Sequence, residues 1–229
     1  MTRTRQAKPT TRAERARQTR RRMLDCAREL FVTEGYAATT MEQIARAAKV
    51  AVQTLYYTFR SKGQLLRELT EVTAAGEDDP LPVMERPWMR EALSAPSAQR
   101  VLALVVEHGT DIYERVAPLW PAVRAAAAAD PELGRYWDGV AAGRRAGQRQ
   151  LVARVAELGA LRVDLNVDRA TDLVVVLMGH DVYGGLVRDA GWNLVAYKSW
   201  LFATLVRQLL RRPRLAPTAY ADLSFADST

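Results

Sequence analysis

Apolar residues recur at helical spacing along most of this chain. Near the N-terminus, Met23, Ala27, Leu30 and Phe31 form one stripe that ends at Gly35, a typical C-terminal cap. Asn166 and Asn193 stand where the N-caps of later helices are expected. The spacing predicts further helices, separated by prolines and glycines, over residues 98–116, 122–129, 132–158, 167–189 and 194–211. The pattern therefore predicts an all-α fold.

Two short helical segments stand close together in the first third of the chain. Thr40, with Gln43 three residues later, predicts a capping box at the start of a helix over 40–48. Residues 49–51 then lead to a second helix over 52–59. Two short helices joined by a three-residue turn are the plan of a helix-turn-helix motif.

The residue types agree with this motif. Apolar and small side chains are expected to fix the crossing of the two helices: Ile44, Ala45, Ala48, Val50 and Leu55. Three polar side chains are left on the outer face of the second helix, where base edges would lie in a major groove: Gln53, Thr54 and Thr58.

A further helix is expected after Ser61, which has Gln64 three residues on. Turn-forming and acidic residues then fill 76–82, so we place a domain boundary there. The resulting division is a basic arm over 1–17, a head over 18–75, a body over 76–212 and a tail over 213–229. The tail contains Pro213 and Pro217 and is expected to be poorly ordered.

Charge is distributed unevenly along the 229 residues. The net charge is +7, and nine of the 33 Lys and Arg residues lie within the first 22 positions, with Glu14 as the only acid there. This asymmetry indicates a polyanion partner for the N-terminus, although a solvated basic tail would have the same composition.

Cys26 is the only cysteine, so no internal disulfide can form and a reducing compartment is expected. No run approaches about 18 unbroken apolar residues, and residues 1–5 lead into no signal peptide. These features predict a cytoplasmic protein that has no membrane partner.

The motif region resembles the TetR family of bacterial regulators. The resemblance is carried by Thr39-Thr-Met-Glu-Gln-Ile-Ala-Arg-Ala-Ala48, by Val50 and by Thr54-Leu-Tyr-Tyr-Thr-Phe-Arg-Ser-Lys62 with Leu65-Leu66, and it spans about residues 18–70. Phrases at 112–118, 125–131 and 191–201 look like those of C-terminal domains in the family. The resemblance implies a DNA-binding head with a larger helical domain for ligand binding and dimerisation.

Contacts with DNA follow from the resemblance, position by position. Thr40 and Lys62 would hold phosphates, and Tyr56 and Tyr57 would touch the sugar-phosphate backbone or a thymine methyl. Val52, Gln53, Thr54 and Thr58 would face bases, with Gln53 suited to bidentate pairing with adenine. Alternative structural roles exist, because Tyr56 and Tyr57 could be packing residues and Lys62 a solvated cation.

Two positions depart from the family pattern. Lys49 stands where the family usually has glycine, and a left-handed residue there costs roughly 1–2 kcal/mol. A contact between Lys49 and a phosphate would recover part of this cost. Ala51 replaces the usual hydroxyl N-cap, at about 1 kcal/mol.

The resemblance further implies that the body makes a homodimer through the last two predicted helices. Residues expected at the dimer interface are His180, Tyr183, Leu194, Tyr197, Trp200, Leu201, Thr204 and Leu205. An unidentified small-molecule effector would bind in the body and weaken operator binding. Candidate effector contacts are Trp88, His108, Tyr113, Trp120, Tyr136, Trp137 and Met178. The same side chains could form an ordinary bundle core, and both histidines lie on apolar stripes typical of core or interface positions.

Other classes of function find less support. The chain has two histidines and lacks His-Glu-x-x-His, Cys-x-x-Cys and phosphate-binding glycine-loop motifs, so we predict no catalytic residue, no metal and no cofactor. An architectural DNA-binding protein without an effector would share the head. The prediction is therefore a regulator that binds double-stranded, pseudo-palindromic operator DNA as a dimer, more plausibly a repressor than an activator on family grounds.

Overall fold

The computed structural model describes residues 11–76, 81 and 83–211 of the chain. Helices account for nearly all of the regular structure in these ranges, and an isolated bridge joins Leu161 to Leu210. The N-terminal helices are α1 (Arg12–Thr33), α2 (Gly35–Ala38), α3 (Met41–Ala47), α4 (Val52–Phe59) and α5 (Lys62–Ala75). The later ones are η1 (Val83–Glu85), α6 (Pro87–Ser94), α7 (Ala98–Val116), η2 (Ala117–Leu119), α8 (Trp120–Ala129), α9 (Pro131–Glu157), α10 (Val167–Leu177), α11 (His180–Tyr183), η3 (Gly184–Asp189) and α12 (Leu194–Leu209).

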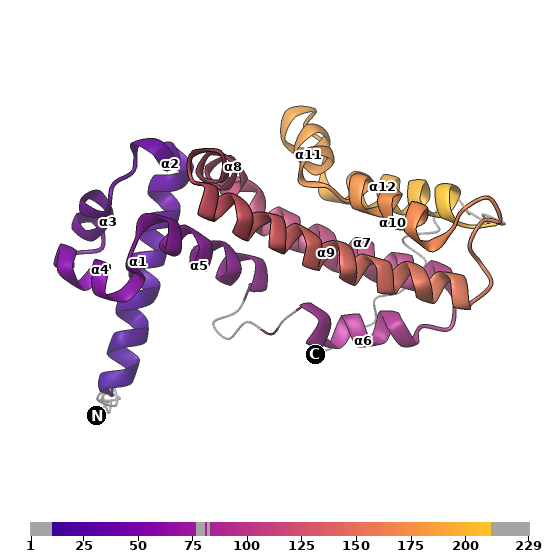
Figure 1. The fold of residues 1–229 in the computed structure, drawn as a ribbon, viewed down its shortest axis with the longest axis horizontal. Helices are drawn as coiled ribbons and strands as arrows, with labels where there is room; N and C mark the ends of the chain where they lie inside the picture. Colours follow the sequence, from indigo (N-terminus) through magenta and orange to yellow (C-terminus); the bar gives the residue numbers. More distant parts are fainter. Residues whose placement is uncertain (1–10, 77–80, 82, 212–229) are drawn as a thin grey trace, which may run out of the picture.

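The helices form a head and an elongated body (Figure 1). In the head, α3 and α4 lie at the end farthest from the body, and α5 leads from them toward it. In the body, α7 and α9 run along the long axis, with α10 and α12 on one side and α6 on the other. The expected all-α fold with a helix-turn-helix head is confirmed.

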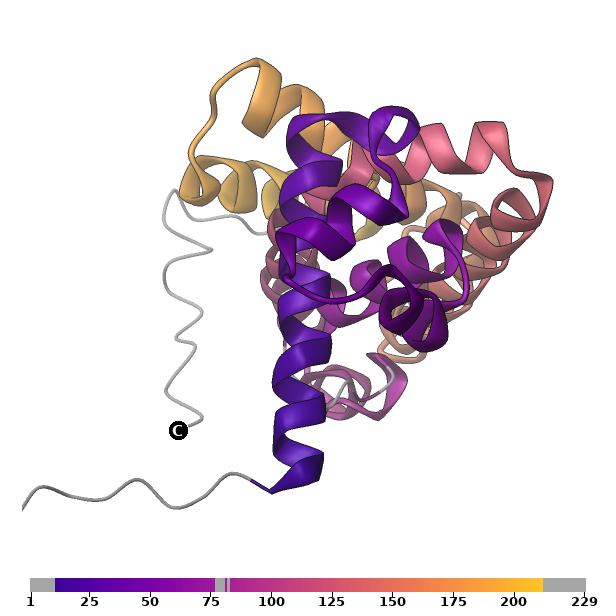
Figure 2. The same ribbon diagram turned by 90° about the vertical axis from the view of Figure 1, so that its left-hand side faces the viewer.

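Helix α1 begins at Arg12, within the segment 1–17 that was predicted to be a basic arm ahead of the first helix. Thr11 caps it through a capping box with Glu14, so the basic residues from Arg12 onward belong to a regular helix. Its buried side chains begin at Met23, and its first turns extend beyond the other helices of the head (Figure 2). Residues 1–10 and the predicted tail at 213–229 lie outside the described residues.

Two apolar clusters make up the core, and the head cluster continues into the body. Ile44 and Leu55 pack in one cluster with Leu119, Val123 and Leu133 of the body segments. Gly63 at the start of α5 lies against Leu133, because a Cβ on this glycine would come within 2.9 Å of a Leu133 methyl. The head is therefore docked on α8 and α9 rather than tethered by a linker alone.

The predicted continuous helix over 167–189 is wrong. Helix α10 ends at Leu177, Met178 and Gly179 leave helical geometry, and α11 and the π-helical turn η3 follow in a new direction. The segment Val167–Asp189 has the length and the mean hydropathy, 1.3, of a membrane span, and 28% of its most apolar window is buried. This is weak evidence for a span, since apolar helices of soluble proteins share these properties.

Candidate DNA-binding and effector sites

The helix-turn-helix is held together by the apolar side chains predicted to fix its crossing, with Phe59 in addition and with Val50 half-buried against the same cluster. Ile44 and Ala45 of α3, Ala48 after it, and Leu55 and Phe59 of α4 are all 0–1% exposed. Leu55 and Phe59 anchor the eight-residue helix α4, which leaves Gln53, Thr54, Tyr56 and Tyr57 exposed. The predicted crossing of the two helices is confirmed.

The outer face of α4 carries exposed polar and aromatic side chains. Gln53 and Thr54 are exposed, and Tyr57 is 91% exposed. Tyr56 is 43% exposed, so it is placed at the edge of this face rather than inside the head. An exposed tyrosine ring on a recognition helix can stack on a sugar or meet a thymine methyl.

Two of the predicted base contacts, Val52 and Thr58, are less exposed than Gln53 and Thr54. Val52 is half-buried and packs against the head cluster. The hydroxyl of Thr58 donates to the carbonyl of Thr54 at 2.8 Å, within its own helix. Direct readout by Val52 and Thr58 stays a prediction, but the geometry favours Gln53, Thr54 and Tyr57.

The turn between α3 and α4 has the backbone that the sequence indicated. Lys49 has φ of 54°, and its side chain is exposed. Ala51 is the N-cap of α4 and provides no side-chain hydrogen bond. A second residue with positive φ, Arg60 at 61°, ends α4 and was not predicted.

Thr40 forms the expected capping box. Its hydroxyl accepts from the amide of Gln43 at 3.2 Å, while its own amide donates to Gln43 Oε1 at 2.6 Å. The amide of Thr40 is therefore already bonded, and the hydroxyl hydrogen is the group left to donate to a phosphate.

Lys62 has a structural role that the sequence analysis did not predict. Its ammonium donates to the carbonyls of Tyr36 at 2.7 Å and Thr39 at 2.9 Å, and it lies 4.2 Å from the centre of the Tyr36 ring. Burial lowers the pKa of Lys62. These contacts tie the start of α5 to the segment that leads into α3, so a phosphate contact by Lys62 would use the remaining N–H.

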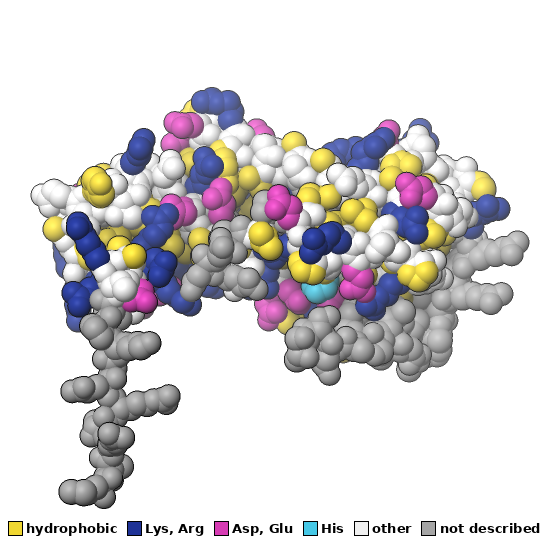
Figure 3. Space-filling model, turned by 90° about the horizontal axis from the view of Figure 1, so that it is seen from below, with side chains coloured by type: hydrophobic (Ala, Val, Ile, Leu, Met, Phe, Trp, Pro, Cys, Tyr) yellow, Lys and Arg dark blue, Asp and Glu magenta, His cyan; other side chains and the backbone are white. Residues whose placement is uncertain are grey.

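Arginines of α1 bond to the end of α3 and to α5. Arg22 Nε donates to the carbonyl of Ala48 at 2.8 Å, which satisfies the end of α3, and Arg20 pairs with Glu68 of α5. Lys and Arg side chains gather over the head when the molecule is seen from below (Figure 3). The head therefore presents the exposed face of α4 together with positively charged side chains.

The predicted effector residues do not line one cavity. Trp88 stacks on His108 with ring centroids 5.0 Å apart, and Trp120 lies with Tyr113 beside His180. Tyr136 and Trp137 lie at the junction with the head, where Tyr136 donates to Glu71 of α5 and Trp137 packs against the head cluster.

Met178 is buried in the body, and its terminal methyl reaches Gly109. Trp88, His108 and Tyr113 belong, with Met178, to the body, so these four remain candidates for an effector site inside it.

The body interior holds polar atoms without partners. The hydroxyls of Thr110 and Tyr197 and the Oε1 of Gln148 are buried and make no hydrogen bond. Tyr113 accepts a hydrogen bond from Arg144 at 2.9 Å, and burial raises its pKa above the ordinary value. Sequence reasoning missed Thr110, Arg144 and Gln148, because single polar residues on apolar helices give no motif.

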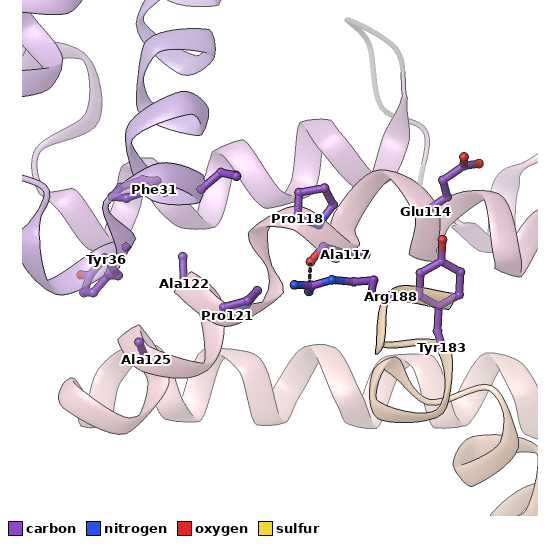
Figure 4. A pocket seen from close by; sticks show the side chains of 12 residues that line it. Phe31, Tyr36, Glu114, Ala117, Pro118, Pro121, Ala122, Ala125, Tyr183 and Arg188 are labelled. Carbon is purple, nitrogen blue, oxygen red and sulfur yellow. Dashed lines mark hydrogen bonds between the residues drawn. The ribbon is translucent and has the colours of Figure 1, made fainter. Parts of the chain in front are cut away.

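An open groove of about 460 Å³ lies between the head and the body (Figure 4). Phe31 and Tyr36 of the head line one end, and Tyr183 and Arg188 line the other. Arg188 donates to the carbonyl of Ala117 at 3.2 Å across its floor. This groove was not predicted, since its walls come from segments distant in the sequence.

Half of the predicted dimer interface is instead the chain's own core. Four side chains expected at the surface are 0–4% exposed within one chain: Tyr183, Tyr197, Leu201 and Leu205. His180 is held in the stack with Trp120. Leu194, Trp200 and Thr204 are half-buried and stay available to a second copy, and the exposed apolar side chains nearby are Val176 at 64% and Val195 at 73%.

No group of three or more His, Cys, Asp or Glu side chains in the described ranges is placed to hold a metal ion.

Comparisons with known proteins agree with this arrangement. A model of bacterial regulatory proteins of the tetR family matches residues 23–69. The chain is 30% identical over 112 residues to TtgW, an uncharacterized HTH-type transcriptional regulator of Pseudomonas putida, over 43% of this chain and 81% of TtgW. It is also 30% identical over 112 residues to SrpR, another HTH-type transcriptional regulator of Pseudomonas putida, over 43% of this chain and about half, 51%, of SrpR. The fold is similar to that of SmeT in its complex with triclosan, with a TM-score of 0.68, 18% identity and coverage of 88% of this chain and 97% of that one.

Proposed function

The chain belongs to the TetR family of bacterial regulatory proteins, and we propose that it is an operator-binding repressor that acts as a homodimer and is released by a small molecule. It is a transcriptional regulator rather than an enzyme. The observation that carries the proposal is the outward presentation of Gln53, Thr54 and Tyr57 on a helix anchored by two buried side chains.

Recognition of DNA uses α4 as the reading helix. Its exposed face carries an amide and a hydroxyl that match base edges in a major groove, and Tyr57 reaches the adjacent backbone. Positive charge around the motif, including Lys49 in the turn, supplies the phosphate contacts that position the helix.

Dimerisation would cover the apolar surface of α10 and α12. Val176 and Val195 are large apolar side chains that water reaches in one chain. Covering exposed apolar side chains favours association, and a two-fold axis beside these helices would give two heads on one duplex. Two heads about one helical turn apart would read a pseudo-palindrome.

Effector binding would use the polar atoms inside the body. Thr110 and Tyr113 lie one turn apart on α7, and Arg144 and Gln148 lie one turn apart on α9, which passes it. A ligand that bonds Thr110 and Gln148 would satisfy atoms that are otherwise buried without partners. SmeT, which shares this fold, was solved with triclosan, so the fold admits a small aromatic ligand.

The route from this interior to the head runs through the end of α7. Arg115, two residues after Tyr113, donates to the carbonyls of Thr73 at 3.2 Å and Ala74 at 2.9 Å, at the end of α5. Since α5 follows directly on α4, a shift of α7 would move the recognition helix. A ligand that prefers one position of α7 would thereby change the spacing of the heads.

Footprinting on genomic DNA tests the proposal. The sites protected by wild type are compared with those protected by Gln53→Ala, and the affinity of each protein for them is measured. We expect wild type to protect a palindromic site, and Gln53→Ala to lose about 10- to 100-fold in affinity for it while non-specific binding is unchanged. Gln64→Ala, at an exposed position of α5 beyond the motif, is the matched control and should bind as wild type does. Uniform coverage of DNA without a preferred site would contradict the regulator and favour an architectural protein.

A further inference from the structure

A basic groove of about 750 Å³ lies between α1 and α5. Residues of α1 line it at helical spacing: Glu14, Arg17, Gln18, Arg21, Leu24, Asp25 and Arg28, with Arg20 beside them. Residues of α5 line the opposite wall, again one helical face: Leu69, Val72, Thr73 and Gly76 just beyond its end. Arg115 of α7 completes the groove.

The walls combine an apolar base with a strong excess of positive charge. Leu24 and Leu69 are buried and Val72 is half-buried, so they provide an apolar surface between the helices. Five arginines line the groove against two acids, Glu14 and Asp25. Glu14 accepts a hydrogen bond from the amide of Thr11 in the capping box of α1, so part of its carboxylate is already bonded.

Two of the arginines are held by backbone carbonyls. Arg115 is half-buried, and its guanidinium is held by the carbonyls at the end of α5. Arg28 is half-buried and donates to the carbonyl of Arg115 at 3.4 Å. A guanidinium has five N–H donors in a fixed fork, so both side chains keep donors beyond these bonds.

Guanidinium groups gathered along one groove favour the binding of an anion there. A phosphate or carboxylate accepts paired hydrogen bonds from guanidinium groups, and such charge-assisted bonds are about twice as strong as neutral ones. Arg28 and Arg115 are half-buried and line one groove with apolar side chains, which suits a small anion with an apolar part better than the phosphates of a rod-shaped duplex.

We propose that the groove between α1 and α5 is a second ligand site, which takes an organic phosphate or carboxylate with its anionic group on Arg28 and Arg115 and its apolar part on Leu24, Leu69 and Val72. The site is separate from the polar interior around Thr110 and Gln148. It touches α1, α5 and α7 together, so its occupant would brace the head against the body.

Calorimetric titration of the full-length protein with octyl phosphate tests this site. We expect octyl phosphate to bind at least tenfold more tightly than either inorganic phosphate or octanol. Inorganic phosphate lacks the apolar chain, and octanol lacks the anionic group. Arg28→Gln should weaken octyl phosphate binding by about tenfold or more, the loss typical of a charge-assisted hydrogen bond. Val72→Glu, which puts a carboxylate into the groove, should abolish it.

Arg90→Gln is the matched control, because Arg90 is an exposed arginine of α6 outside the groove, and it should bind octyl phosphate as wild type does. Thermal melts of each variant establish that it folds. Equal binding by wild type, Arg28→Gln and Val72→Glu would overturn the proposal, as would equal affinity for octanol.

A third result would also overturn it. If Arg28→Gln leaves octyl phosphate binding unchanged but lowers the salt dependence of DNA binding, the groove is part of the DNA surface instead. Because octyl phosphate binding is measured without DNA, failure of this site leaves the proposed repressor function standing.

Discussion

The imidazole of His180 stacks on the indole of Trp120, with ring centroids 3.8 Å apart and ring planes 18° from parallel. Tyr113 meets the same imidazole edge-on at 4.6 Å. These contacts join α7, α8 and α11 at one point of the body. Burial lowers the pKa of His180 to about 3, with Arg144 adding to the effect, so the ring in the stack is neutral.

Folding stability should therefore fall as the pH is lowered through the range in which only the unfolded chain binds a proton at His180. That range lies between about 6.5, the ordinary pKa of histidine, and about 3. Between pH 7.5 and pH 5 the loss from this residue should be at most roughly 2 kcal/mol. Denaturant unfolding at the two pH values measures it.

His180→Phe keeps an aromatic ring in the stack and removes the titration, so it should reduce the difference between the two pH values. Burial also lowers the pKa of His108, so this residue contributes to the same pH dependence. His108→Phe removes that second contribution, and comparison of the two variants separates the effects of the two histidines. An unchanged pH dependence in His180→Phe would show that the imidazole is not held neutral by the stack.

Lys49→Gly should stabilise the head and weaken operator binding. Glycine adopts the left-handed backbone at Lys49 without the side-chain penalty, so the free energy of unfolding should rise by up to about 1 kcal/mol. Loss of one phosphate contact should flatten the slope of log affinity against log salt concentration by about 0.9. Lys49→Arg retains the charge and should change neither quantity. A lower slope in Lys49→Arg as well would rule out a simple charge contact.

Lys62→Met should destabilise the head while leaving the salt slope unchanged. The substitution removes the two bonds to the carbonyls of Tyr36 and Thr39, and bonds of this charged type contribute about 1.5–3 kcal/mol each. Thermal melts and operator titrations over a range of salt concentrations separate the two effects. A slope lowered by about 0.9 would instead establish the phosphate contact that the family pattern implies.

Val176→Asp and Val195→Asp should dissociate the dimer without unfolding the chain. Both side chains are exposed in one copy, so a carboxylate is costly only where a second copy covers it. Sedimentation should show monomers, and operator affinity should fall because one head reads too few base pairs. Val140→Asp, at a 46% exposed position of α9, is the control and should remain dimeric. Dimers that persist in both α10 and α12 variants would place the interface elsewhere.

Much of the head could be predicted from the sequence, because its signals are local. The capping box at Thr40, the left-handed Lys49 and the bounds of α4 all depend on residues within a few positions of one another. By contrast, the bonds of Lys62 join it to residues 23 and 26 positions away. No local pattern reveals such partners.

In the body, periodicity predicted α7 correctly but could not separate core from interface. Tyr197 and Leu201 lie on the apolar stripe of α12 that was assigned to a second copy, yet both are 0% exposed within one chain. An apolar stripe shows that a helix face is covered, and it does not show by which chain. The break at Gly179 was missed for a similar reason, since apolar residues continue on both sides of it.

The anchoring of α4 also has a consequence for divergence among related regulators. Leu55 and Phe59 alone are buried in this helix, left-handed Lys49 lies in the turn before it, and Arg60, with φ of 61°, is its C-cap. Exchanges at Gln53, Thr54 or Tyr57 would therefore leave folding almost untouched. Selection could retune the operator that the protein prefers by mutating this helix, one position at a time, without compensating changes in the rest of the molecule.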